Sequence, residues 1–123
     1  AALIRWVGGG PPPARGDPIR TTGDGTEIAR DELGIARGGI RTPSVDVPVA
    51  ALSGEADPGA TLLCRLFGRS VPFDAATLAS LYPTRQAYLE RFAQALDRAI
   101  ARGFVRAADR AAYAAEAEAA AQG

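Results

Sequence analysis

The sequence predicts an α+β fold, in which a region of strands and loops precedes a helical C-terminal part. Three observations lead to this prediction. Valines alternate with other residues over positions 44–49, with the period of two that is typical of a β-strand. Apolar residues over positions 88–100 recur at helical spacing. Clusters of glycine and proline separate these segments. We treat residues 1–123 as a single partial domain.

The first segment, residues 1–14, is expected to be the end of a helix followed by a proline-rich exit. Apolar residues cluster at positions 3–7, and three glycines and three prolines follow them at 8–13. Glycine and proline end helices, and consecutive prolines favour an extended conformation. The segment therefore leads the chain out of a helix and into loop structure.

Residues 15–70 are predicted to form strands and loops. Turn-forming residues at 23–25 and 31–34 are flanked by isoleucines, which indicates a small β-hairpin. The strand at 44–49 contains Pro48, which lacks a backbone donor and therefore restricts the strand to an edge or its end. A polar loop at 54–59 precedes an apolar stretch, 60–67, that could form a strand or a short helical turn.

Residues 71–123 are predicted to form a tail of two or three helices. Asp74 and Thr84 are suitable N-caps for a short helix ending at Leu81 and for a longer helix behind it. Gly103 stands where a left-handed C-cap is expected. A final alanine-rich helix is expected over residues 107–121, with Tyr113 as its one large apolar side chain.

The composition leaves few large side chains for a core. Hydrophobic residues make up 47% of the chain. Of these residues, 27 are alanine, whereas leucine, isoleucine, valine and phenylalanine together number 26. Since alanine buries little area, we expect a partner surface to complete the core. The chain lacks methionine, so we expect that Ala1 is not the original N-terminus and that an upstream part is missing. All fourteen basic residues are arginine, which is typical of high-GC bacterial sequences.

Charge and cysteine content exclude several classes of function. The net charge is zero, which argues against nucleic acid as a main partner. No apolar run reaches 18 residues, so no membrane span is expected. Cys64 is the single cysteine, so neither an internal disulfide nor a cysteine-based metal site can form.

Nucleophilic catalysis lacks its usual base, because the chain contains neither histidine nor lysine. Residues 68–72 (Gly-Arg-Ser-Val-Pro) resemble half of a G-x-S-x-G elbow around Ser70, but proline replaces the last glycine. Ser53 is a weaker candidate, because Ala51 stands at the first glycine position. We therefore predict no catalytic residue in this chain.

Carboxylates are the only plausible metal ligands. Four carboxylates are close in sequence: Asp24, Glu27, Asp31 and Glu32. They lack the spacing of a calcium loop, so we favour a solvated turn over a metal site. We predict no metal and no cofactor. The pairs Asp31/Glu32 and Glu55/Asp57 leave a carboxylate-only glycosidase as a weaker alternative.

Arg41 and Asp46 are the two candidate substrate-binding residues. They lie in an unusual segment rich in glycine, proline and β-branched residues, at 39–48. In one interpretation the segment lines a substrate pocket, and Arg41 contacts an anion or an acyl oxygen. In the other, which we favour, an internal Arg41–Asp46 ion pair fixes the loop.

The run DELGIARGGIRTPSVDVP at 31–48 resembles the C-terminal signature of the bacterial "alpha/beta hydrolase domain" protein family. Shorter matches follow in order at 52–54, 66–68, 72–74, 81–83 and 103–104, and the helix and proline-rich exit at 3–13 also looks similar. Ile35 departs from the pattern, where Asn or another turn former is expected. The resemblance therefore covers nearly the whole chain.

The resemblance implies the C-terminal part of an α/β-hydrolase-like fold and a serine hydrolase acting on small ester-like substrates. In that fold the triad runs serine, acid, histidine, so a segment without histidine would follow the triad. The chain would then have a structural and pocket-lining role, with the missing N-terminal part of the same domain as its partner, and would be inactive alone. The alternative is a free-standing helical interaction module that presents Leu89, Phe92 and Leu96 to a partner.

Overall fold

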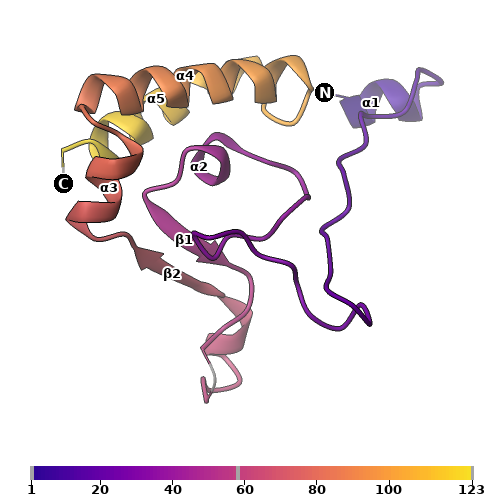
Figure 1. The fold of residues 1–123 in the computed structure, drawn as a ribbon. Helices are drawn as coiled ribbons and strands as arrows, with labels where there is room; N and C mark the ends of the chain where they lie inside the picture. Colours follow the sequence, from indigo (N-terminus) through magenta and orange to yellow (C-terminus); the bar gives the residue numbers. More distant parts are fainter. Residues whose placement is uncertain (1, 58, 123) are drawn as a thin grey trace.

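The computed structural model describes residues 2–57 and 59–122, which form five α-helices and one two-stranded antiparallel sheet (Figure 1). This mixture confirms the predicted α+β class. In chain order the elements are α1 (Ala2–Val7), α2 (Pro43–Asp46), β1 (Ala50–Ser53), β2 (Arg69–Pro72), α3 (Ala75–Leu81), α4 (Arg85–Ala101) and α5 (Arg110–Ala120).

The N-terminal part of the chain is mostly loop. Helix α1 has no buried residue and lies at the end of an extended segment, apart from the sheet (Figure 1). The predicted hairpin is reduced to isolated bridges, in which Thr21 pairs with Ile28, Arg30 with Ala36, and Ile19 with Gly38. The two predicted turns are therefore present, but among the described residues 15–40 they connect no regular strands.

The sheet lies further along the chain than the sequence predicted. Ala50 of β1 is opposite Pro72 of β2, and Ser53 is opposite Arg69. The connection contains a 3₁₀ turn at Cys64–Leu66 and ends at Gly68, whose φ is +63°. A Cβ atom on Gly68 would lie 2.3 Å from the carbonyl oxygen of Ser53, so only glycine fits this close approach of the two backbones.

The predicted strand over residues 44–49 is wrong, because residues Pro43–Asp46 form the short helix α2. Pro43 occupies the first helical turn, where its fixed φ is already suitable and its missing donor costs nothing. Val47 then points into the core and is 6% exposed. The alternating valines suggested a strand, but the proline before them begins a helical turn instead.

The C-terminal helices begin and end close to the predicted residues. The Asp74 side chain accepts a hydrogen bond from the backbone N–H of Thr77, and Thr84 accepts one from Ala87, so both predicted N-caps are confirmed. Gly103, at φ +77°, follows α4 and allows the N–H of Phe104 to reach the carbonyl oxygen of Ala99. A 3₁₀ turn at Ala107–Asp109 then leads into α5.

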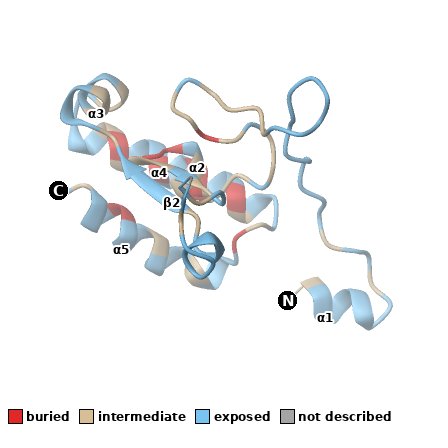
Figure 2. Cartoon of the chain, turned by 90° about the horizontal axis from the view of Figure 1, so that it is seen from below, coloured by how far each residue is buried: buried red, intermediate tan, exposed pale blue. Residues whose placement is uncertain are grey.

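The core forms around one face of α4. Its buried residues are Tyr88, Phe92, Ala95, Leu96 and Ala99. One cluster joins this face to Val47 and to Ala117 of α5, and a second joins it to Val105. Figure 2 shows the buried positions gathered around α4 and its neighbours, whereas α1 and β2 are largely exposed.

The buried face of α4 argues against the alternative of a free-standing interaction module. Phe92 and Leu96 are 2% and 3% exposed, because they pack within the chain's own core. They therefore cannot present the partner surface that the free-standing module would require. The predicted apolar periodicity of this helix is confirmed, but it serves internal packing.

Tyr82 connects the end of α3 to the loop before β1. Its hydroxyl donates a hydrogen bond of 2.9 Å to the carbonyl oxygen of Pro48, and its ring meets the Tyr88 ring edge-on, with centroids 5.1 Å apart. Burial raises the pKa of Tyr82 to about 12, and burial also raises the pKa of Tyr88. Both phenols are therefore held in their neutral form in the folded chain.

Replacing Phe92 with alanine should lower the free energy of unfolding by about 3–5 kcal/mol, because the change leaves a cavity at the centre of the core. Urea unfolding followed by circular dichroism measures the loss. Leu66→Ala is the matched control, since Leu66 is 77% exposed; its effect should stay within about 0.5 kcal/mol. Equal losses in both variants would contradict the assigned core.

Stability should also fall between pH 10 and about 12. A tyrosine whose pKa is raised on folding contributes stability that is complete below its unfolded pKa of 10.0 and is lost as the pH rises toward its folded value. Thermal melts across this interval should show a decreasing midpoint, with a shallower decrease for Tyr82→Phe. An unchanged slope in that variant would refute the assigned burial of the phenol.

Candidate functional site

The structure brings the two candidate substrate-binding residues together. Arg41 Nε lies 2.5 Å from Asp46 Oδ1, and the other two guanidinium nitrogens donate to the carbonyl oxygens of Ala36 and Val45, each at 3.1 Å. The two charged side chains are 28% and 30% exposed. Arg41 therefore joins the 36–41 loop to α2, which is the internal ion pair that the second interpretation expects. Direct contact of Arg41 with a substrate stays a prediction.

The carboxylates of the N-terminal loops are engaged locally. Asp24 accepts from both the hydroxyl and the backbone N–H of Thr26, and the hydroxyl contact is the main reason that its pKa lies below the usual value. Asp31 accepts from the backbone N–H groups of Leu33 and Ile35, so it stabilises its own turn. Over residues 2–57 and 59–122, no three His, Cys, Asp or Glu side chains are grouped as metal ligands.

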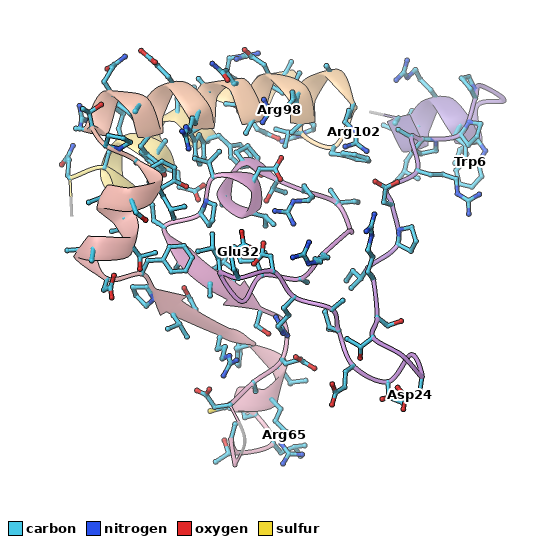
Figure 3. All side chains as sticks on the ribbon, viewed as in Figure 1. Trp6, Asp24, Glu32, Arg65, Arg98 and Arg102 are labelled. Carbon is cyan, nitrogen blue, oxygen red and sulfur yellow. The ribbon has the colours of Figure 1, made fainter. Side chains whose placement is uncertain are left out.

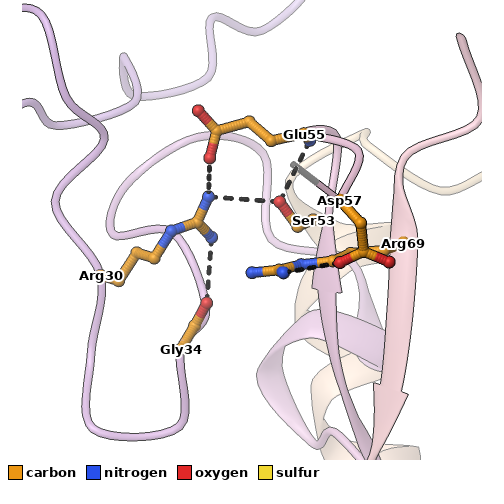
Figure 4. Close-up of polar contacts among 6 residues, drawn as sticks. All are labelled: Arg30, Gly34, Ser53, Glu55, Asp57 and Arg69. Carbon is orange, nitrogen blue, oxygen red and sulfur yellow. Dashed lines mark hydrogen bonds and ion pairs between the residues drawn. The ribbon is translucent and has the colours of Figure 1, made fainter. Parts of the chain in front are cut away.

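Arg30 connects the same loop to β1. It donates to the carbonyl oxygen of Gly34 at 3.0 Å and to Ser53 Oγ at 3.2 Å, and it forms an ion pair with Glu55 (Figure 4). Asp57 pairs separately with Arg69 at 3.0 Å. The two members of the Glu55/Asp57 pair thus bind different arginines, and an acid–base role would require both carboxylates to leave those partners.

The serine candidates lack the surroundings of a nucleophile. Ser70 lies within β2, opposite Leu52, rather than on a sharp turn between a strand and a helix. Ser53 Oγ accepts hydrogen bonds from Arg30 and from the backbone N–H of Glu55. With no histidine in the chain, neither hydroxyl has the base that nucleophilic attack requires.

A cavity of about 170 Å³, which no pattern in the sequence indicates, lies between α2, the sheet, α4 and α5. At its edge, Ser44 Oγ donates a hydrogen bond of 3.0 Å to Glu116 Oε1. The walls are mainly apolar and include Val47, Phe92 and Tyr88. Because Ser44 and Glu116 are 72 positions apart, no local motif in the sequence indicates their contact.

Three exposed side chains at the periphery of the chain do not line this cavity. Figure 3 shows Trp6, Asp24 and Arg65 at the periphery of the chain, on α1, on a loop and on the connection between the strands.

None of the helices in the described residues has both the length and the hydrophobicity that a membrane crossing requires.

These features define an α+β domain with apolar cavities and without a complete hydrolytic triad of its own. The family described as "Alpha/beta hydrolase domain" matches residues 1–115, and the chain belongs to this family. The resemblance seen in the sequence motifs is thereby confirmed. Neither the curated proteins nor the solved structures include a significant match to the chain.

Replacing Arg41 with alanine should destabilise the chain by about 2 kcal/mol, because two carbonyl oxygens and Asp46 lose a shared, partly buried donor. Arg106→Ala is the matched control. Arg106 also pairs with an aspartate, Asp109, but its side chain is 74% exposed, so its loss should destabilise the chain much less than the loss of Arg41. Chemical unfolding of both variants measures the difference, and equal effects would argue against a structural role for Arg41.

Proposed function

We propose that this chain is the C-terminal, accessory part of an ester-type serine hydrolase, and that a separate catalytic part of the same domain supplies the nucleophile, the acid and the histidine. One observation carries the proposal: the chain belongs to a hydrolase family and yet contains no histidine. A serine hydrolase of the usual kind needs a base close to its nucleophile. The accessory role accommodates both facts.

The exposed apolar residues support a partner surface of this kind. Leu62, Leu63, Leu66 and Phe67 are 67–84% exposed on the connection between β1 and β2. A second group lies on α1, where four residues are at least half exposed: Leu3, Ile4, Trp6 and Val7. Large contiguous apolar surfaces are uncommon on monomeric proteins and usually mark contacts with other molecules. We propose that these surfaces pack against the catalytic part.

We further propose that the 39–48 segment lies beside the substrate pocket of the assembled hydrolase. The Arg41–Asp46 pair and the carbonyl contacts of Arg41 give this segment a defined shape. A loop fixed in this way can line a pocket at low entropic cost. The substrate would be a small-molecule ester, and Arg41 would lie near its acyl oxygen.

The purified 123-residue chain should not hydrolyse small acyl esters such as p-nitrophenyl acetate or butyrate above the buffer rate. A spectrophotometric assay measures this directly. Co-expression with a catalytic part that carries serine, acid and histidine should restore turnover. Robust hydrolysis by the chain alone, abolished by Ser70→Ala, would overturn the accessory role.

A carboxylate-only glycosidase is the second candidate from the sequence. Substituting Asp31, Glu32, Glu55 and Asp57 together by their amides tests it, with any glycosidase activity of the chain as the readout. The local partners of Asp31, Glu55 and Asp57 favour structural roles, so we expect no activity attributable to them.

A further inference from the structure

Two cavities meet at Tyr88. The cavity of about 170 Å³ beside Ser44 and a neighbouring one of about 220 Å³, which reaches α3, share three lining residues: Val49, Tyr88 and Ala120. Most other side chains around both are apolar, but Arg85 lines the larger cavity. If each non-hydrogen atom takes a volume similar to the ~30 Å³ of a water molecule, either cavity holds a ligand of about five to seven such atoms.

Glu116 supplies the negative charge at this site. Its Oε1 accepts the hydrogen bond from Ser44, and no arginine of the described residues forms an ion pair with it. Glu118, on the same helix, differs because it pairs with Arg85. A carboxylate can accept several hydrogen bonds, so Glu116 retains acceptor capacity beside the apolar cavity.

The hydroxyl of Tyr88 is the second polar group. Tyr88 is 5% exposed and lines both cavities, and its hydroxyl has no hydrogen-bond partner in the part of the chain that the structure describes. The neighbouring Tyr82, by contrast, donates to Pro48. Burial, and secondarily the charge of Glu116, raise the pKa of Tyr88, so its phenol stays neutral. Every fully buried side-chain nitrogen or oxygen atom of the described residues has a hydrogen-bond partner, so this unpaired hydroxyl is open to the cavities, where it can contact a ligand.

We propose that the cavity of about 170 Å³ binds a small organic cation, an ammonium group on a short apolar chain, whereas Arg85 in the wall of the neighbouring cavity would repel such a ligand. Glu116 pairs with the ammonium, the Tyr88 hydroxyl oxygen accepts one of its N–H groups, and the apolar walls hold the chain. A carboxylate ligand would instead be repelled by Glu116. This binding site goes beyond the hydrolase role, because it involves no catalytic step and neither Arg41 nor Asp46, although Ser44 and Val47 in its wall belong to the 39–48 segment.

Binding of n-hexylammonium, hexan-1-ol and hexanoate to the full chain tests the proposal, by isothermal titration calorimetry and by NMR shifts at Tyr88. Hexylammonium should bind at least about tenfold more tightly than hexanoate, because a charge-assisted hydrogen bond contributes about 1.5–3 kcal/mol. Its affinity should also fall as salt is added. Equal affinity for hexanoate, or no binding of hexylammonium at millimolar concentrations, would overturn the proposal.

Two conservative variants locate the site. Glu116→Gln should weaken hexylammonium binding by about tenfold or more, and Tyr88→Phe should weaken it several-fold. Glu118→Gln is the matched control on the same helix and should bind like the unchanged chain, since Glu118 faces Arg85. Undiminished binding by folded Glu116→Gln protein refutes the site. If that variant does not fold, the preference of the unchanged chain for hexylammonium over hexanoate decides the question.

Discussion

The architecture depends on the burial of one face of α4. Phe92 and its neighbours on that face belong to the two core clusters of the described residues. One cluster packs Val47, which follows α2, and Ala117 of α5 against this face, and the other packs Val105 against it. Few other large side chains of the described residues are buried; Ile35 is one of them. With alanine making up so much of the apolar content, this face supplies most of the hydrophobic free energy that opposes chain entropy. The N-terminal loops are positioned instead by polar contacts to β1 and α2.

Those polar contacts are made largely by arginine. Arg30 ties a loop to β1, and Arg41 ties another loop to α2, each by contacting carbonyl oxygens as well as a carboxylate. The guanidinium group has five donors in a planar arrangement, so one side chain can satisfy several acceptors in loops that lack regular pairing. In this chain arginine side chains therefore hold the N-terminal loops in place, whereas the helices are stabilised by their own backbone hydrogen bonds and caps.

The features of the fold that depend on neighbouring residues could be predicted from the sequence. Asp74, Thr84 and Gly103 mark helix ends because capping depends on neighbouring backbone groups. Residues 43–46 were assigned incorrectly because the alternation of valines was weighed above Pro43, which begins a helical turn, and because the burial of Val47 against α4 is a tertiary contact. The position of β2 and the Ser44–Glu116 contact depend on pairings across long stretches of chain, to which period and propensity are insensitive. The candidate pair Arg41 and Asp46 lay close enough in sequence to be recognised.

Helix α5 combines a high helical propensity with a shallow attachment to α4. Only Ala117 of this helix is buried, and two of its links to α4 are exposed ion pairs, from Arg110 to Asp97 and from Glu118 to Arg85. Elements with few apolar contacts open locally at a small fraction of the global unfolding energy. Because Glu116 and Ala120 form a wall of the cavity beside Ser44, such an excursion of α5 would expose its interior, with loss of the contact between Ala117 and the Phe92 cluster. The alanine-rich helix thus provides a route by which molecules could enter and leave.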